Sequence, residues 1–124
     1  MTQPLALVFY EKLLPGTQLS NRLQDLGYRV TPVGDVDSLL KQAAESHPML
    51  VIADLLAKKS QVALTIKALR ENPATRHLPI IGYCGDKEDR LKKEALSAGA
   101  NFVVDESVLL NHLPQFLEQA LHID

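Results

Sequence analysis

The chain alternates short apolar runs with segments whose apolar residues recur at intervals of three and four. Apolar runs of roughly four to eight residues indicate buried strands, and intervals of three and four indicate a helix with one buried face. The apolar runs lie at 5–10, 49–53, 79–84 and 102–104, and residues 28–33 return to a short extended pattern before Gly34. No other feature constrains the fold as much, because this alternation predicts five strands that are each followed by a helix.

Cap and breaker residues mark the ends of the predicted helices. Asp35 or Asp37 is a suitable N-cap for the second helix, and Pro48 ends it. Gly99 is a suitable C-cap for the fourth helix, and Pro114 suits the first turn of the last one. The helices are predicted at 17–26, between Asp35 and Pro48, from about 62 until Asn72-Pro73 breaks the pattern, at 86–98, and from about 113.

Strand–helix pairs with short loops favour a parallel sheet covered by helices on both faces, because each right-handed crossover returns the chain to the same sheet. We therefore predict one α/β domain over 1–124, a doubly wound five-stranded parallel sheet with strand order 2-1-3-4-5. In such sheets functional groups gather beyond the carboxyl ends of the strands, near the switch point between the first and third strands. Asp54 directly follows the third apolar run and is the first candidate for a functional residue.

The charge balance argues against binding to nucleic acid or to a membrane surface. The formal net charge is −2, which gives no basic footprint for either partner. The apolar runs are far shorter than the ~20 residues of a membrane helix. Cys84 is the single cysteine, so an internal disulfide is excluded. We expect a cytoplasmic protein whose partners are proteins or small ligands.

Three stretches carry a resemblance to a known family. Residues 71–81, ENPATRHLPII, follow Asp54 at the family's spacing, and residues 23–30, LQDLGYRV, and 95–102, ALSAGANF, are supporting matches. Together they make the whole chain resemble the receiver domain of bacterial response regulators, the CheY-like family. The resemblance implies a flavodoxin-like fold and a place in two-component signal transduction. In that family two acids after the first strand hold Mg²⁺, an Asp after the third accepts a phosphoryl group, a Ser or Thr after the fourth binds that group, and a Lys after the fifth pairs with it.

Transferred position by position, the family's site is only partly present. The resemblance places Asp54 at the phosphoacceptor position and Cys84 at the hydroxyl position. A thiol is only a weak hydrogen-bond donor. The acidic pair falls on Tyr10 and Glu11, which leaves one carboxylate of the two. The resemblance therefore implies a degenerate pocket.

The largest departure follows the fifth strand. The lysine position falls on Asp105, or on Glu106 if the strand aligns without a gap, so an anion replaces a cation. Phosphoryl transfer is catalysed almost wholly by positioning and by neutralising charge, so a phosphorylated Asp54 would meet repulsion here. Lys58 and Lys59, which replace the family's Pro-Gly turn, either swing inward to compensate or remain solvated.

Several residues keep two interpretations. A hard cation such as Mg²⁺ is compatible with Glu11 and Asp54, with Asp105 as a third oxygen ligand, and an acidic rim without metal is the alternative. Asp54 is either a phosphoacceptor or a structural acid that binds loop amides. Cys84 is either a redox sensor or a small packed residue. Phe102 falls on the family's aromatic switch position and is equally well explained as core packing.

We therefore expect an atypical stand-alone receiver domain, a pseudo-receiver, which is not an enzyme and acts by protein–protein interaction with phosphorylation lost or inefficient. Its expected partners are a histidine kinase, an output protein, or a second copy bound through the fourth helix, fifth strand and fifth helix, the face that family members use. One alternative is a working receiver phosphorylated on Asp54 by a histidine kinase. The other is a small-ligand binder or enzyme on a flavodoxin-like scaffold, although EKLLPGTQ at 11–18 holds a single glycine and no phosphate-cradling pattern.

Overall fold

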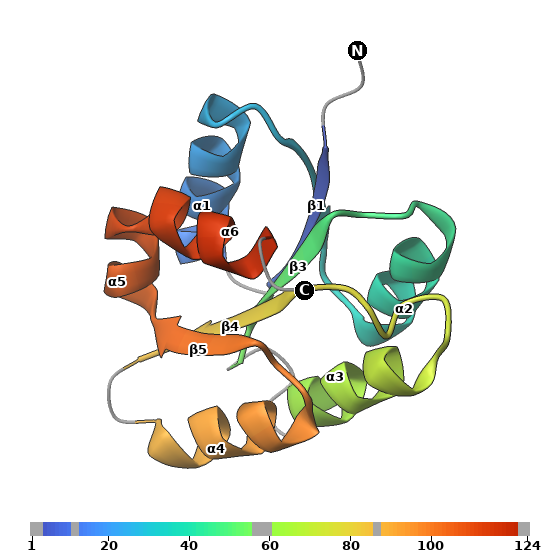
Figure 1. The fold of residues 1–124 in the computed structure, drawn as a ribbon. Helices are drawn as coiled ribbons and strands as arrows, with labels where there is room; N and C mark the ends of the chain where they lie inside the picture. The colour runs from blue at the N-terminus through green and yellow to red at the C-terminus, as the bar shows by residue number, and fades with distance from the viewer. Residues whose placement is uncertain (1–3, 11–12, 56–60, 86–87, 122–124) are drawn as a thin grey trace.

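A computed structural model describes residues 4–10, 13–55, 61–85 and 88–121. Five strands form one parallel sheet in the order β2-β1-β3-β4-β5 (Figure 1). This confirms the predicted doubly wound sheet and its strand order. The strands are β1 (Leu5–Phe9), β2 (Arg29–Val33), β3 (Leu50–Asp54), β4 (Ile80–Cys84) and β5 (Phe102–Asp105).

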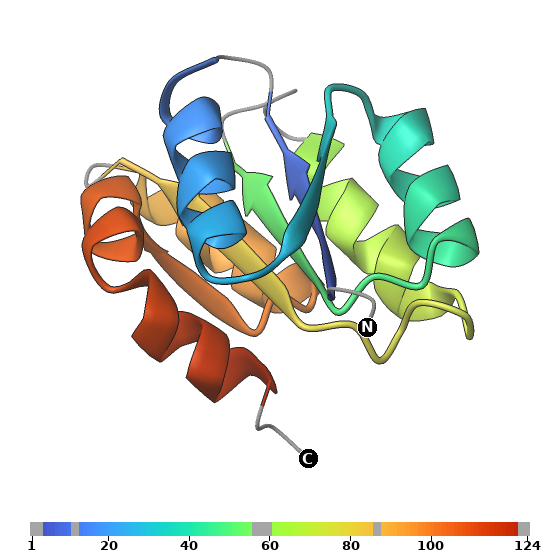
Figure 2. The same ribbon diagram turned by 90° about the horizontal axis from the view of Figure 1, so that it is seen from above.

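Helices cover both faces of the sheet. One face carries α1, α5 and α6, and the other carries α2, α3 and α4 (Figure 2). Over the described residues, no helix combines the length and the apolar character needed to cross a membrane. The helices are α1 (Leu13–Asp25), α2 (Val36–Glu45), α3 (Gln61–Glu71), α4 (Asp89–Ala98), α5 (Glu106–Asn111) and α6 (Leu113–Leu121).

The core consists of two apolar layers, one on each side of the sheet. Every residue of β1, β3 and β4 is buried, because these central strands have helices above and below. Successive side chains of a strand point to opposite faces, so Leu7 and Phe9 pack toward α2, α3 and α4 while Val8 and Ile52 pack toward α1, α5 and α6. The continuous apolar runs of the sequence are thus explained by burial on both faces.

The structure corrects several predicted boundaries. The first helix begins at Leu13 instead of residue 17, the fourth begins at Asp89 instead of residue 86, and β5 continues to Asp105. A helix that was not predicted, α5, lies between β5 and α6. Its six residues are too few to display helical periodicity, and it is anchored by one buried side chain, Leu109. The predicted start of the last helix at about 113 is confirmed by α6.

The predicted caps can be located. Asp35 is the N-cap of α2, where Oδ1 of its side chain accepts a hydrogen bond of 2.8 Å from the backbone N–H of Ser38. The helix ends at Glu45, before Pro48. Gly99 is the C-cap of α4, with a φ of +123° that favours glycine, and its N–H bonds to the helix carbonyls.

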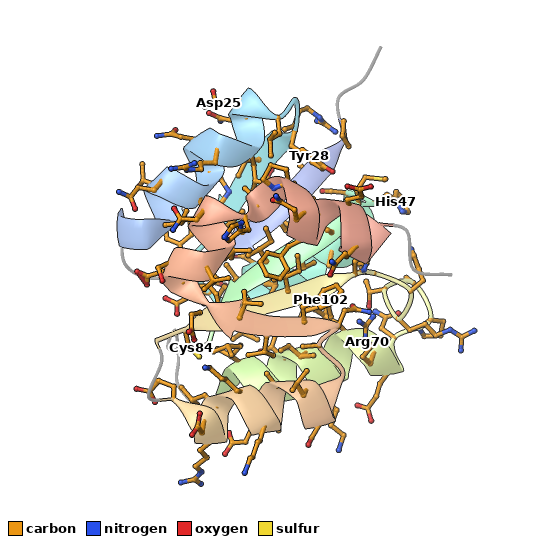
Figure 3. The ribbon with its side chains drawn as sticks, turned by 60° about the vertical axis from the view of Figure 1, so that its left-hand side comes forward. Asp25, Tyr28, His47, Arg70, Cys84 and Phe102 are labelled. Carbon is orange, nitrogen blue, oxygen red and sulfur yellow. The ribbon has the colours of Figure 1, made fainter. Side chains whose placement is uncertain are left out.

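Arg70, in the last turn of α3, ties together the amino ends of β4 and β5 (Figure 3). It is half-buried, and desolvation lowers the pKa of its guanidinium. Asn101 joins the same network, because its Oδ1 accepts both from Arg70 and from the N–H of Ile80 at 2.8 Å. This network lies at the amino ends of the strands, opposite to the carboxyl ends where Cys84 lies. The guanidinium donates to the carbonyl oxygens of Gly99 at 2.9 Å, Arg76 at 2.7 Å and Leu78 at 2.6 Å, and to Asn101 at 2.7 Å.

Candidate functional site

The carboxyl ends of β3, β4 and β5 bring three of the predicted site residues onto adjacent strands. Asp54 ends β3 and pairs in register with Tyr83 of β4, and Cys84 of β4 pairs in register with Asp105 of β5. Asp54 is buried, with 7% of its surface exposed. The parallel register therefore brings these residues together at the carboxyl ends of the strands, as predicted. There, the buried carboxylate of Asp54 lies near the thiol of Cys84 and the carboxylate of Asp105.

Of the two residues predicted at the acidic-pair position, one can be placed. Tyr10 follows β1, is half-buried, and packs against the core layer of α1, α5 and α6. Its backbone N–H donates to the carbonyl of Val33 at 3.1 Å, which continues the pairing of β1 with β2. Glu11 lies outside the described residues, as do Lys58 and Lys59.

Cys84 is a packed thiol. Its side chain is 1% exposed and belongs to the core layer under α2, α3 and α4. Burial raises the pKa of the Cys84 thiol, and the carboxylates of Asp105, Glu88 and Asp54 raise it further against the opposing effect of Lys92. A protonated, buried thiol is a poor nucleophile, so the geometry favours the packing interpretation of Cys84 over redox sensing.

Asp105 forms an ion pair with Lys92, which was not predicted from the sequence. Nζ of Lys92, on α4, lies 2.8 Å from Oδ1 of Asp105, and the two side chains are 25% and 29% exposed. The hydrogen bond to Asp105 raises the pKa of Lys92. Leu91 and Ala95 face the core, so position 92 lies beside the core, near the carboxyl ends of the strands. This helical pattern is the feature of the sequence from which the position of Lys92 could have been predicted.

Tyr83 is a second site residue that sequence analysis missed. Its ring is 1% exposed, and its hydroxyl has no hydrogen-bond partner within the described part of the chain. Burial raises the pKa of Tyr83 well above its usual range, and the charges of Asp54 and Glu106 and the neighbouring Tyr10 add to the effect. Glu106, which directly follows Asp105 at the end of β5, therefore acts electrostatically on the same hydroxyl as Asp54.

Phe102 contacts an aromatic ring of the last helix. Its ring centroid lies 6.3 Å from that of Phe116 on α6, with the planes at 60°, an edge-to-face arrangement. Phe102 is half-buried and belongs to the layer of α1, α5 and α6. The contact explains an aromatic residue at this position by packing, and a role as a switch stays a prediction.

The described residues do not form a metal centre by themselves. They contain no group of three or more His, Cys, Asp or Glu side chains placed to hold a metal ion. Asp105, a predicted third ligand, is bound to Lys92, which would have to be displaced. Glu11 lies outside the described residues, so the Mg²⁺ site at Glu11 and Asp54 stays a prediction.

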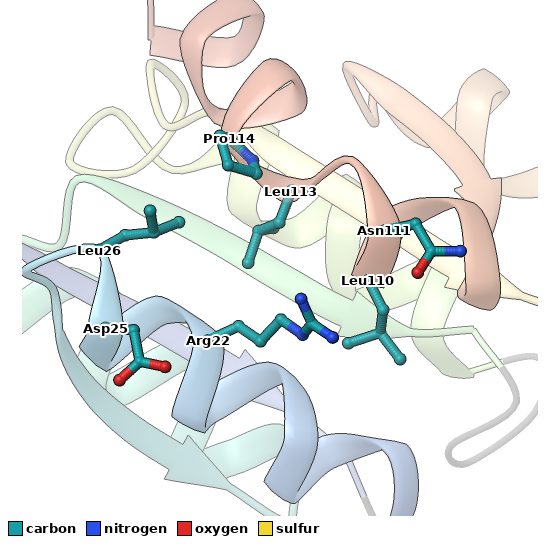
Figure 4. Close-up of a pocket in the computed structure, with 7 residues that line it drawn as sticks. All are labelled: Arg22, Asp25, Leu26, Leu110, Asn111, Leu113 and Pro114. Carbon is teal, nitrogen blue, oxygen red and sulfur yellow. The ribbon is translucent and has the colours of Figure 1, made fainter.

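A surface groove of about 270 Å³ lies away from this edge, between α1 and the α5–α6 junction (Figure 4). Arg22 extends from α1 toward Leu110 of α5, and Leu113 lines the groove at the start of α6. None of the predicted site residues lines it. The groove is therefore separate from the candidate site.

The sequence matches no protein-family model and no curated protein. The structure, in contrast, closely resembles solved receiver domains. A response regulator from Chloroflexus aurantiacus superposes with a TM-score of 0.90 at 21% identity, over 98% of this chain and 100% of that one. The chemotaxis response regulator CheY4 of Vibrio cholerae gives 0.84 at 22% identity, over 97% and 100%.

A third neighbour is the receiver domain of a sensor histidine kinase from Pseudomonas aeruginosa, whose structure holds a magnesium ion in the active-site cleft. Its TM-score is 0.86 at 21% identity, over 98% of this chain and 100% of that one. At these identities the comparisons establish the fold: the chain has the CheY-like fold of response regulator receiver domains. The predicted resemblance is confirmed at that level.

Proposed function

We propose that this chain is a cytoplasmic, receiver-like domain of two-component signalling that acts by binding proteins, without efficient phosphorylation of Asp54 and without catalysis of its own. The observation that supports this most is the ion pair of Lys92 with Asp105 at 2.8 Å. Asp105 supplies an anion where a phosphorylated aspartate would need a cation, and Lys92 is engaged by that anion. The carboxyl ends of the strands therefore carry little positive charge that could neutralise a phosphoryl group on Asp54.

The electrostatic cost follows from the charges at this edge. A phosphoryl group adds about 1.5 to 2 negative charges, and catalysis of its transfer depends on neutralising that charge. Asp105 and Glu106 would both repel a phosphorylated Asp54. Cys84 replaces a hydroxyl with a weaker donor, and its raised thiol pKa keeps it neutral. Each departure opposes formation of the acyl phosphate.

We keep the predicted surface for a partner or a second copy. Its fourth helix, fifth strand and fifth helix correspond to α4, β5 and α6, with the additional helix α5 between β5 and α6, and we call it the α4–β5–α5 face. Strand β5 is an edge strand, flanked by α4 and α5. Leu96 lies one helical turn after Lys92, on the side of α4 that meets β5, and is 51% exposed. Val108, in α5, is 39% exposed. Large apolar side chains exposed on both sides of an edge strand support binding of a protein there.

One observation favours the alternative of a working phosphoacceptor. Lys92 affects the pKa of Cys84, so its ammonium group lies close to the position of the family's hydroxyl. This alternative requires the Lys92 side chain to leave Asp105 and approach Asp54. On this alternative, α4 supplies the charge that the family takes from the end of the fifth strand.

The two functions are separated by an amide ¹H–¹⁵N titration with Mg²⁺ and then beryllofluoride, which mimics an acyl phosphate. We expect no shifts at Asp54, Cys84 or Phe102 in the wild type. The triple variant Cys84→Thr/Asp105→Lys/Lys92→Ala restores the family's donor and cation and should gain those shifts. Adding Asp54→Ala to the triple variant should abolish them.

The outcomes distinguish the proposals. Shifts in the wild type that vanish in Asp54→Ala would establish phosphoacceptor chemistry and refute the proposal. Lys92→Ala alone would then report whether α4 provides the cation. If the triple variant also fails to respond, the charge reversal at Asp105 is not the reason for the loss.

A further inference from the structure

Helices α3 and α4 lie side by side (Figure 1). A groove of about 620 Å³ lies between them, on the side of α4 away from β5. Ala63 and Ala98 line its deeper part, since both are half-buried and Ala98 packs against the core. Leu64 lines it from α3 and is 66% exposed, more than any other large apolar side chain among the described residues. Leu64 and the two alanines together give the groove an apolar lining, and apolar side chains gathered in a groove are typical of a binding site.

The rims of this groove are positively charged. Lys67 of α3 and Lys93 of α4 line it, and both are exposed. Neither has an ion-pair partner within the residues that the structure describes. The acid on the rim, Glu94, accepts a hydrogen bond of 2.9 Å from Nε of Arg90, so its partner is on α4 itself and not one of the two lysines. The groove thus combines an apolar floor with two available cations.

We propose that the α3–α4 groove binds an amphipathic helix of a partner protein, with an apolar residue placed over Leu64 and acidic residues that meet Lys67 and Lys93. A helix fits because the alanines allow close approach of a third helix, packed across two others by ridges into grooves. An added strand does not fit, since the backbone groups of α3 and α4 are already bonded within their helices. Charge complementarity selects an acidic helix.

A nucleic acid is a poorer occupant. The lining of the groove contains no aromatic side chain on which a base could stack, and the chain is net acidic. The groove is also distinct from the α4–β5–α5 face, because Lys93 and Ser97 line it while Lys92 and Leu96 face β5. One helix therefore presents two separate surfaces.

The test is selection against the full chain from a displayed library of stapled helical peptides with randomised outward positions. We expect the binders to be enriched in Asp and Glu on both sides of a Leu or Phe. When these peptides bind, the amide signals of the protein that shift most should be those of Ala63, Leu64 and Ser97. In fluorescence anisotropy, Lys67→Glu and Lys93→Glu should each weaken binding about fivefold, and Leu64→Ser about tenfold.

Two matched variants serve as controls: Leu96→Ser removes the exposed leucine on the other side of α4, and Lys41→Glu reverses an exposed lysine of α2. Both should leave the affinity unchanged. Peptides with Lys in place of Glu should bind the Lys67→Glu/Lys93→Glu variant, a rescue that a general loss of stability could not produce.

Selected peptides without acids, peptides sensitive to Leu96 instead of Leu64, or no Leu64-dependent binders would each overturn the proposal. A dimer in sedimentation that is lost in Leu64→Ser would assign the groove to a second copy and overturn it as well. The beryllofluoride experiment tests the chemistry of Asp54, and the Leu96→Ser control tests binding at the α4–β5–α5 face. A negative result for the groove is therefore distinguishable from a negative result for the proposed function.

Discussion

Replacing Arg70 with alanine should destabilise the fold more than any other single change at a charged residue of α3. The variant loses four hydrogen bonds of 2.6 to 2.9 Å from one guanidinium. A hydrogen bond to a charged group contributes about 1.5–3 kcal/mol, but water can take over an exposed acceptor. Arg76 is exposed, so its carbonyl can be solvated, whereas Leu78 is buried. We therefore expect a loss of about 2–4 kcal/mol in the free energy of unfolding.

The assay is urea unfolding followed by far-ultraviolet circular dichroism, because the chain has no tryptophan to report by fluorescence. Arg76→Ala and Arg90→Ala are the matched controls. Arg76 contributes only its backbone carbonyl to the network, and Arg90 forms a surface ion pair with Glu94, one helical turn away. Each of these two replacements should therefore lower the free energy of unfolding by less than about 0.5 kcal/mol. A loss below about 1 kcal/mol for Arg70→Ala would refute the reasoning, since the network would then have no net effect on stability.

A double-mutant cycle with Gly99→Ala tests the packing of the same side chain. A Cβ at Gly99 would lie 2.6 Å from Cγ of Arg70, and the φ of +123° disfavours any side chain. In the Arg70→Ala background the collision disappears and only the backbone cost of about 1–2 kcal/mol remains. The double variant should therefore be more stable than the sum of the single changes predicts, by about 1 kcal/mol. Strict additivity would mean that Arg70 does not pack over Gly99.

Three further predictions concern the candidate site. Tyr83→Phe removes a buried hydroxyl that has no partner within the described residues, so urea unfolding should show no loss and up to about 1 kcal/mol of gain; a clear loss would reveal a partner. Phe102→Ala and Phe116→Ala should show a coupling of about 0.5–1.5 kcal/mol in a double-mutant cycle, and no coupling would contradict the edge-to-face contact. Stability should fall as pH rises above 9.0, the ordinary pKa of a thiol, because burial raises the pKa of Cys84 and the unfolded chain loses the proton first; Cys84→Ala should reduce this slope in pH-dependent melting.

The fold was predictable because the apolar pattern and the topology rules act on whole segments. Five strand-length runs and the short connections between them lead to the strand order that the structure has. Boundaries were less predictable, since helix ends depend on a few local hydrogen bonds. Asp35 and Asp37 were equally suitable caps by composition, and the choice of Asp35 follows from its bond to Ser38. Helix α5 was missed because Leu109 is its one buried anchor.

The residues of the candidate site also divide into those that were predictable from the sequence and those that were not. Asp54, Cys84 and Asp105 were predictable because parallel strands bring their carboxyl ends to one edge whatever the details of packing. Tyr83 could have been found by the same rule, since it precedes Cys84 on β4. It was missed because a tyrosine in an apolar run looks like ordinary core, and only the structure reveals that its hydroxyl is buried without a described partner.

Helix α4 explains why charge partners are harder to predict than strand ends. In a helix each residue turns the side chain by about 100°, so neighbours in sequence reach different surfaces. Lys92 binds Asp105 at the edge of the sheet, while Lys93 lines the groove with α3. The sequence contains both lysines but not the rotation of the helix, which is set by the packing of Leu91 and Ala95 against the core. Two lysines adjacent in sequence thus lie on different surfaces: Lys92 is bound to Asp105 at the carboxyl ends of the strands, and Lys93 lines the groove for which we propose a partner helix.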